Sequence, residues 1–479
     1  MLSKTISRLL LSLLVFFISK TFSNESYLEE GEARGEPWFP EPTPTPPPGP
    51  SVAECNRNIY RRCNQPTQFS ANDLNTVLTY LNTTYTTLAD IKPDNSVQLC
   101  SAITVRRDWK CLTVAQRNRI VNDFQQLYTN GVIANLTDTY VRYWAAWHET
   151  GELFLAQRWL AYELESAMQQ IDPGVILPYW CPWPAAAHPE RSIVWDTFGH
   201  NGSYPGGYCV GDGVYNTWGL IPCVKRHWSP RGTIYPWASP ELDTNLLHYG
   251  TLYELFYLAY IGIYYQPLIN AGGYEGQFSK QDAPYDVLFY MKSLCETEVR
   301  GIKWQLSKQE NLTPLSYNLL NTRFDPQTGA IQQADINTDT LTGVPDVSIK
   351  QLFWLGFGNL CVIPDSVVRP VVRASKGQAD PLPRAIQRMQ PWIVAKYYSG
   401  FQNGNTSNLL STFEEVGDCN QQCLPLPKPT FLPETPAGRR LLADQGVNRG
   451  SLLSIAEQRY YSLWYDLNKS GYCSPYVTN

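Results

Sequence analysis

Imidazole groups are the side chains to examine first, because histidine is a common metal ligand and a general acid or base near neutral pH. The 479-residue chain contains only five, at His148, His188, His200, His227 and His248. We interpret His148 as a hydrogen-bonded core residue; the alternatives are a relic metal ligand or part of a single-metal hydrolytic site with a nearby carboxylate. His200 stands between glycine and asparagine, as is typical of a turn. We assign no role to the other three.

Cysteine is the other residue type that can do chemistry here, and the chain has 12. In an oxidising compartment this even number predicts up to six disulfides, whose connectivity the sequence leaves open. A metal cluster is the alternative. It is disfavoured because only Cys419 and Cys423 form a close pair, with no second pair at ligand spacing.

The elements that must position these side chains are mainly helical. Thr113 and Gln116 form a capping box that opens a helix, and Ile120, Phe124 and Leu127 lie on one face of it. We interpret Glu163 and Glu165 as the charged face of another helix, and acid and base roles for them as the alternative. The further helices are predicted over Tyr140–His148, Phe154–Ile171, Asn245–Tyr265, Asp286–Ser307 and Ser451–Leu467.

Two proline-rich stretches divide the chain, because proline lacks a backbone donor and cannot continue a helix or a ladder. We expect a linker over residues 24–50, a main domain over 51–375, and an extension over 376–479 that holds the second proline-rich segment and a terminal helix. Residues 178–240 are rich in Gly, Pro and Trp and predict long irregular loops.

Residues 1–23 have the pattern of a secretory signal peptide, with Lys4 and Arg8 before an apolar stretch from Leu9 to Ile18. That stretch is too short to cross a bilayer, so an uncleaved anchor is the weaker interpretation. Seven Asn-x-Ser/Thr motifs agree with a glycosylated surface. The sequence therefore predicts a secreted, extracellular glycoprotein.

Composition excludes some classes of partner. Lys plus Arg number 38 and Asp plus Glu 43, giving a net charge of −5, which is too mild to suggest a nucleic-acid binder. The segment Leu252–Ile269 is strongly apolar, but Glu254 interrupts it, so we expect a buried core helix and no membrane span. Aromatic residues make up 13% of the chain, which predicts a large aromatic core.

Three stretches, taken in order and spacing, resemble the two copper-binding halves of the tyrosinase family of type-3 copper proteins, in its secreted animal form. The resemblance spans about residues 100–305 and implies a mainly α fold: a four-helix bundle around a di-copper centre, with long irregular disulfide-linked loops. It also implies that Arg158, Asp286 and Trp304 hold the bundle together. The stretches are HETGELFLAQRWL from His148, the pair Gly272-Gly273, and APYDVLFYMKS from Ala283 followed by Lys303-Trp304-Gln305.

The same resemblance implies six histidine ligands, three for each copper, and five histidines cannot supply them. His148 matches the middle ligand of the first half. The positions where a ligand is implied but another residue stands are Gln157, Tyr264, Leu268, Lys292 and Ser293. Copper in such sites prefers neutral imidazole nitrogen. An amide, a leucine and a tyrosine that is protonated near neutral pH are poor substitutes.

Lys292 opposes metal binding directly, because an ammonium group repels a cation. In a dry pocket it would need a carboxylate partner. The candidates that the family geometry implies are Glu149, Glu152 and Glu163.

We therefore expect a tyrosinase-like domain over 51–375 with a degenerate copper site, no cofactor and no catalytic residues. Such a protein is a pseudoenzyme with an extracellular matrix or binding role, whose partner is a matrix component, another extracellular molecule or a phenolic small molecule. The alternatives are a copper-dependent phenol or catechol oxidoreductase with an unconventional site, and the single-metal hydrolytic site built on His148.

Overall fold

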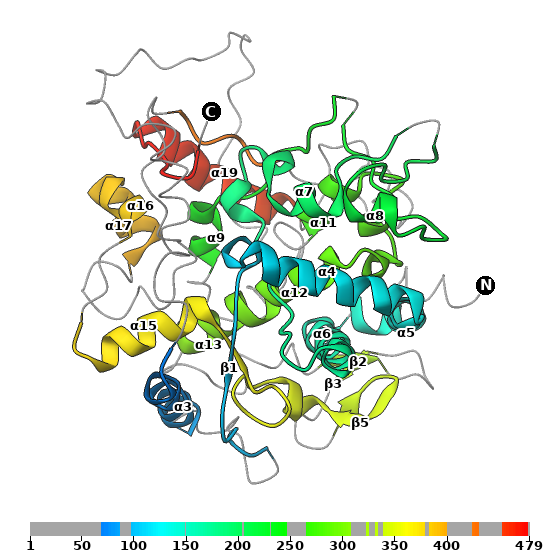
Figure 1. Ribbon diagram of the computed structural model, residues 1–479. Helices are drawn as coiled ribbons and strands as arrows, with labels where there is room; N and C mark the ends of the chain where they lie inside the picture. The colour runs from blue at the N-terminus through cyan, green and yellow to red at the C-terminus, as the bar shows by residue number, and fades with distance from the viewer. Residues whose placement is uncertain are drawn as a thin grey trace.

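The structure is a computed structural model that describes residues 69–86, 97–148, 150–203, 206–229, 231–246, 265–307, 322–324, 331–333, 339–378, 383–399, 424–430 and 453–477. The predicted signal peptide and linker, Glu149, His248 and Tyr264 lie outside these residues. Within them the chain is mainly helical with a few short strands (Figure 1), which confirms the expected fold class. No helix within these ranges is long and apolar enough to cross a membrane.

Four helices pack together at the centre of the described chain. The helix α6 (Glu152–Ile171) lies against both α5 (Val132–His148) and α12 (Leu288–Leu294), and α4 (Val114–Thr129) packs on α5 and α6. Leu155, Ala156 and Leu160 of α6 have no exposed surface. The four helices therefore share one apolar core.

The start of α4 is the one that the sequence predicts. The Thr113 side chain accepts a hydrogen bond from the Gln116 amide, and the Gln116 side chain accepts one from the Thr113 amide at 2.9 Å. The expected apolar face, Ile120, Phe124 and Leu127, is buried. Both findings confirm the prediction.

Residues 288–307 form a continuous helical run that widens into a π-helical turn in its middle. After α12 comes a π-helical turn, η7 (Cys295–Arg300), and then α13 (Gly301–Ser307). A helix was predicted over Asp286–Ser307, and the helical run begins two residues later, at Leu288. The Asp286 carboxylate accepts the Leu288 amide at 3.1 Å. Gly301 is needed where α13 passes α6: a Cβ there would lie 2.4 Å from the Phe154 ring.

The helix predicted over Asn245–Tyr265 falls largely outside the described residues. Its flanks are helical, as α9 (Pro240–Leu246) before the gap and α11 (Tyr265–Gly272) after it. Gln266 and Leu268 of α11 are buried. The part of the apolar segment that the structure describes therefore faces the core.

The loops between residues 178 and 240 contain only short helical pieces in their described part, as predicted. Arg226 organises them: its guanidinium is fully buried, lies 4.7 Å from the Trp195 ring and pairs with Asp286 at 2.6 Å. The helical pieces of this region are α7 (Val194–Phe198), α8 (Gly213–Thr217) and the 3-10 turns Trp183–Ala185 and Pro189–Arg191. The 3-10 turns Gln277–Ser279 and Ala283–Tyr285 precede α12, and Trp109–Cys111 precedes α4.

At the periphery of the described structure, segments that are distant in sequence pack together. Strand β1 (Thr104–Arg106) pairs in parallel with β6 (Val362–Pro364), and α3 (Ala71–Thr86) packs on α15 (Asp365–Ser375). The hairpin of β4 (Thr340–Leu341) and β5 (Val344–Ser348) lies against α6 (Figure 1). The remaining elements here are β2 (Thr322–Phe324), its antiparallel partner β3 (Ile331–Gln333) and the 3-10 turn η8 (Ile349–Leu352).

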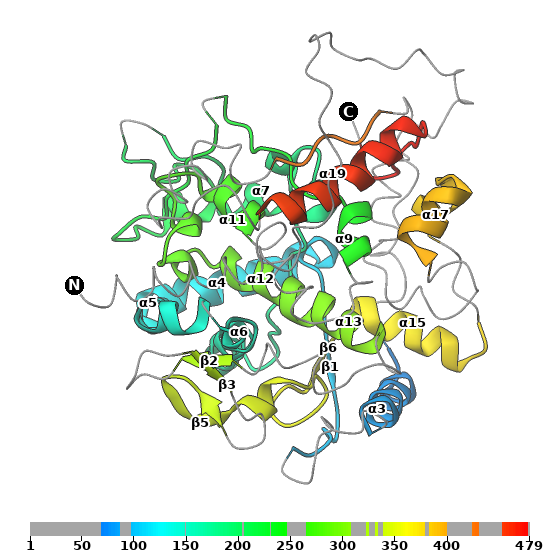
Figure 2. The ribbon, with the colours of Figure 1, turned by 180° about the vertical axis from the view of Figure 1, so that it is seen from behind.

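The C-terminal helices pack on the same body. They are α16 (Arg384–Arg388), α17 (Pro391–Tyr397) and α19 (Leu453–Lys469), the last of which confirms the predicted terminal helix. Helix α19 contacts α9 and α17, and residues 424–430 run beside it (Figure 2). Whether the extension begins at residue 376 stays a prediction.

Three disulfides are resolved between described residues: Cys100–Cys361, Cys181–Cys295 and Cys209–Cys223. Cys111 and Cys473 are disulfide-bonded as well. These bonds confirm the expectation of a disulfide-linked protein. The close pair Cys419 and Cys423 lies outside the described residues.

Candidate metal centre

His148 is the last residue of α5 and is buried in an aromatic environment. Its Nε2 atom is hydrogen-bonded to the Tyr140 hydroxyl, and its ring stacks on Trp144 with the centroids 4.5 Å apart. Burial lowers the pKa of His148 to about 3. The imidazole is therefore neutral at physiological pH, and its Nε2 atom, a possible metal donor, is already bonded to a tyrosine.

The other positions implied by the resemblance are also buried, apart from Tyr264, which is not described. Gln157 lies on α6, Leu268 on α11, and Lys292 and Ser293 on α12, each with at most 3% of its surface exposed. A chain of ring contacts leads from His148 through Tyr140 to Phe289, whose ring centroid is 5.2 Å from that of Tyr140. Phe289 lies one helical turn before Lys292 and Ser293, so α5 and α12 face each other here.

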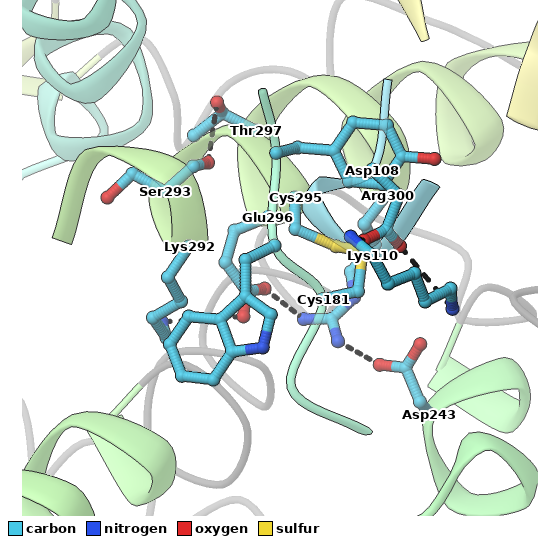
Figure 3. The surroundings of a disulfide bond; sticks show 12 residues. Asp108, Lys110, Cys181, Asp243, Lys292, Ser293, Cys295, Glu296, Thr297 and Arg300 are labelled. Atoms are coloured by element: carbon cyan, nitrogen blue, oxygen red, sulfur yellow. Dashed lines mark hydrogen bonds and ion pairs between the residues drawn. A yellow bond between two sulfur atoms is a disulfide. The ribbon is translucent and has the colours of Figure 1, made fainter. Parts of the chain in front are cut away.

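Lys292 belongs to a buried group of four alternating charges (Figure 3). Its Nζ atom lies 3.4 Å from Glu296 Oε1, and the other Glu296 oxygen is hydrogen-bonded to Arg300. The Arg300 guanidinium also pairs with Asp243 of α9 and lies 4.6 Å from the centre of the Trp183 ring. Two ammonium or guanidinium groups thus face two carboxylates, and the group is neutral as a whole.

The electrostatics of Lys292 follow from this placement. Burial lowers its pKa to about 8, and the Glu296 carboxylate opposes the shift by favouring the charged form. At neutral pH the ammonium form still predominates. A positive charge therefore sits on α12 at one of the positions where the resemblance implies a copper ligand.

The expectation of a buried Lys292 with a carboxylate partner is confirmed, but the partner at ion-pair distance is Glu296 and was not among those expected. Glu152 accepts hydrogen bonds from the Thr342 amide and hydroxyl instead, at 3.1 and 3.0 Å. Glu163 is half-buried on α6, and Glu149 is not described. The missed signal was the spacing of Lys292, Glu296 and Arg300, four residues apart, which places alternating charges on one helix face.

The remaining carboxylates near the bundle have structural partners. Glu165 pairs with Arg106 at 2.5 Å and accepts the Leu177 amide at 2.8 Å, and Arg106 also pairs with Glu298 at 2.6 Å. Such saturation leaves Glu165 unsuited to acid–base work. Glu165 was expected on a charged helix face, but it is buried with 7% of its surface exposed.

Arg158 and Asp286 lie where they can join elements of the bundle, as the resemblance implies. Arg158 donates to the carbonyl oxygens of Thr297, Leu352 and Phe353 at 2.5 to 2.9 Å. Asp286 accepts from the Tyr215 hydroxyl at 2.8 Å besides its pair with Arg226. Each side chain therefore ties α6 or the start of α12 to loops far away in sequence.

The other described histidines lie apart from this region. His200 bonds Asp212 at 2.7 Å in the loop, and His227 stacks on Tyr208 at 4.0 Å. His188 is 3.4 Å from Glu190 with 43% of its side chain exposed. No group of three or more His, Cys, Asp or Glu side chains among the described residues could hold a metal ion.

The residues present therefore do not fit a di-copper centre. The described positions offer one imidazole that is bonded to a tyrosine, one amide, one hydroxyl, an apolar side chain and an ammonium group. Copper sites need several neutral nitrogen or thiolate donors in a defined geometry. We derive no reaction step through copper in this chain.

No family model matches this sequence, and no curated protein does. A solved structure that matches is that of a mutant polyphenol oxidase from Thermothelomyces thermophila. It shares 14% sequence identity over 61% of this chain and 95% of that chain, with a TM-score of 0.43. A likeness of this size establishes neither the family nor the activity of this chain.

Proposed function

We propose that this protein is a secreted, tyrosinase-like scaffold that has lost its di-copper centre and acts without catalysis, in binding or in an extracellular matrix. The observation that carries the proposal is the ion pair between Lys292 on α12 and Glu296 on η7. The motifs around His148, Gly272 and Asp286 supply the resemblance. The residues that stand at the implied ligand positions supply the argument against metal.

The charge balance around Lys292 explains why a metal is disfavoured. Glu296 and Asp243 carry two negative charges, which Lys292 and Arg300 already neutralise. A divalent cation placed beside them would make the buried group strongly positive, and uncompensated buried charge is costly. The Lys292 ammonium thus supplies positive charge that a copper ion would otherwise supply.

Metal analysis tests this proposal directly. The purified mature protein is exposed separately to excess copper and zinc, desalted and measured for metal per chain, and oxygen uptake is recorded with a catechol. We expect no retained metal and no uptake. Two coppers per chain with catechol oxidation would establish the oxidase instead, and one ion per chain would favour the single-metal site at His148.

A matched variant removes the ambiguity of surface binding. His188 and His200 each lie beside a carboxylate and are partly exposed, so they could hold copper adventitiously. The double variant His188→Gln/His200→Gln leaves the interior unchanged. Copper that is lost in this variant belongs to the surface, whereas copper that persists contradicts the proposal.

The matrix or binding role has its own test. The disulfides of the described chain agree with an oxidising compartment. We expect the protein in the culture medium or bound to extracellular material after secretion. A protein that stays inside the cell, or that enriches in no extracellular fraction and captures no ligand, would contradict this part of the proposal.

A further inference from the structure

Residues 424–430 (Leu-Pro-Leu-Pro-Lys-Pro-Thr) form an extended strand along α19 (Figure 2). Leu426 and Pro429 are buried, whereas Pro425 and Lys428 are exposed. A burial pattern that repeats every three residues is that of the polyproline II helix, which has three residues per turn and no internal hydrogen bonds. The three prolines of the segment favour the same conformation.

Helix α19 binds both backbone groups of the buried leucine. The Trp464 indole donates to the Leu426 carbonyl at 2.8 Å, and the Asn468 side-chain oxygen accepts the Leu426 amide at 2.9 Å. Trp464 and Asn468 are four residues apart, so they lie on one face of the helix. The Asn468 amide also donates to the Leu426 carbonyl, at 3.3 Å.

The next turn of the strand is held in the same manner. The Tyr461 hydroxyl donates to the Pro429 carbonyl at 3.5 Å, and the Lys428 ammonium lies 4.4 Å from the centre of the Tyr461 ring. At the end of the strand, Gln266 of α11 donates to the Thr430 carbonyl at 2.7 Å. The strand therefore contacts α19 along its length and α11 at its end. We call the contacting residues of these two helices the groove.

The α19 side of this groove is anchored to the protein body independently of the strand. Asp466 accepts from Lys396 at 2.9 Å and from the Tyr397 hydroxyl at 2.7 Å, both on α17. Beyond the helix, Tyr472 and Ser474 donate to the buried Glu241 carboxylate at 2.9 and 2.6 Å. These contacts would keep Tyr461, Trp464 and Asn468 in place if the strand left.

We propose that the groove formed by Tyr461, Trp464 and Asn468 of α19 with Gln266 of α11 is a binding site for polyproline II strands. Residues 424–430 are its resident ligand, and a separate proline-rich strand with a large apolar residue and a proline three positions apart competes for it. Aromatic side chains that donate to the carbonyl groups of such a strand recognise its shape and not one unique sequence. This site is independent of the proposed loss of copper.

Residues 424–430 occupy the site and compete with any external ligand for it. This strand is joined to α19 by residues 431–452, and a covalently joined ligand competes at an effective concentration on the order of millimolar. An external ligand must displace it and therefore binds the unaltered protein weakly. Weakening the resident strand should raise the apparent affinity for the external one.

A labelled peptide with the sequence of residues 424–430 tests the site by fluorescence anisotropy. In the full chain, Leu426→Ser with Pro429→Ser weakens the resident strand and leaves the anchors of α19 intact. We expect this variant to bind the peptide at least tenfold more tightly than the unaltered protein. Adding Trp464→Phe should reduce that binding about fivefold, since one hydrogen bond contributes about 1 kcal/mol. The matched control, Trp392→Phe at an exposed tryptophan of α17, should change nothing.

Hydrogen exchange provides a second measurement on the unaltered protein. The Leu426 amide, bonded to Asn468, should exchange slowly, and excess peptide should accelerate its exchange while the amides of α19 remain protected. The proposal is overturned if peptide at a concentration above the effective concentration of the resident strand leaves Leu426 exchange unchanged. A control peptide carries glycine at the positions of Leu426 and Pro429. The proposal is also overturned if the Leu426→Ser/Pro429→Ser protein binds the original peptide no more tightly than this control peptide.

Discussion

The buried charged side chains on α12 and the turn after it form a neutral set, and their arrangement shows why the interior tolerates them. An isolated ammonium in the core would be strongly disfavoured, but a carboxylate one helical turn away, itself bonded to a guanidinium, makes the charge tolerable. Lys292 and Arg300 flank Glu296 in this way, and Asp243 completes the set. The stability of the region is therefore tied to the protonation state of Lys292.

The pH dependence of stability should reveal this lysine. Its pKa is lowered from 10.5 to about 8 in the folded protein, with burial as the main cause. Between these values the unfolded chain binds a proton that the folded chain has released, so stability rises with pH across this window. The free energy of unfolding, relative to that of Lys292→Met, should increase by about 3 kcal/mol from pH 8 to 10.5.

Urea unfolding of both proteins between pH 7 and 10.5 measures this difference. The variant Lys376→Met, which removes an ammonium that is 54% exposed in its pair with Asp73, controls for the loss of a positive charge as such. A difference between the unaltered protein and Lys292→Met that is flat or falls with rising pH would show that Lys292 is not buried as described.

At this scale the sequence could predict that Lys292 is buried and paired, but not with which carboxylate. The expected partners came from helices brought near by the resemblance, whereas the actual one, Glu296, is local to the same helical run. Its approach depends on the α12–η7 geometry, which no spacing rule specifies. His148 was interpreted as a hydrogen-bonded core residue, and it is indeed buried and hydrogen-bonded, to Tyr140.

Among the elements, the periodic helices were predictable and the irregular ones were not. Helix α5 begins at Val132, eight residues before the predicted start. The buried residues Ile133, Leu136 and Tyr140 stand at helical spacing, and this signal for an earlier start was missed. The π-helical turn after Leu294 has the same residue types as an α-helix and leaves no sequence signal. The hairpin β4–β5 was not predicted because its strands have two and five residues.

The β4–β5 hairpin contacts the end of α5 and the start of α6 through Thr342. The effect of replacing the next residue, Gly343, tests this packing. That glycine has φ +82° and an added Cβ would lie 2.2 Å from the Tyr143 ring. The ring packs on Trp147, whose indole donates to the Thr342 carbonyl at 3.0 Å. Gly343→Ala should therefore cost about 2 to 4 kcal/mol, which combines a left-handed backbone of about 1 to 2 kcal/mol with a clash.

A matched glycine separates these two causes. Gly377 also has a positive φ, +67°, but an added Cβ would meet nothing within 4 Å. Gly377→Ala should cost only the backbone part, and Tyr143→Ala should reduce the cost of Gly343→Ala to the same level in a double-mutant cycle. Equal costs for the two glycines in the unaltered protein would contradict the packing described at the hairpin.

Across the whole molecule, the contacts between segments that are distant in sequence could not be predicted from the sequence. Twelve cysteines predicted a cross-linked chain, but not that Cys100 pairs with Cys361 or that β1 and β6 run in parallel beside that bond. Such pairings depend on the complete path of the chain. Local propensity predicts the helices, whereas the pairing of cysteines and strands depends on the three-dimensional arrangement of the chain.

Of the three disulfides resolved between described residues, the two with the largest and smallest sequence separation should contribute unequally to stability. Cys100–Cys361 spans 261 residues and Cys209–Cys223 spans 14. In the chain-entropy model the longer loop loses more freedom on cross-linking, which gives about 5 kcal/mol for the first bond and about 3 kcal/mol for the second. The first estimate allows for the shortening of its loop by Cys181–Cys295, which lies within it.

Replacing each pair by alanine and measuring unfolding in urea tests whether this ranking holds. Cys100→Ala/Cys361→Ala should be the less stable of the two variants by about 2 kcal/mol, and exchange of the Thr104 amide, bonded to the Cys361 carbonyl at 2.9 Å, should accelerate in it. The loop bond should leave that amide unaffected, because Cys209 and Cys223 close a local turn. If the two variants were equally stable, the loop lengths would not control the contribution of these bonds. Native contacts such as β1–β6 would then already hold the ends of the long loop together in the unfolded ensemble.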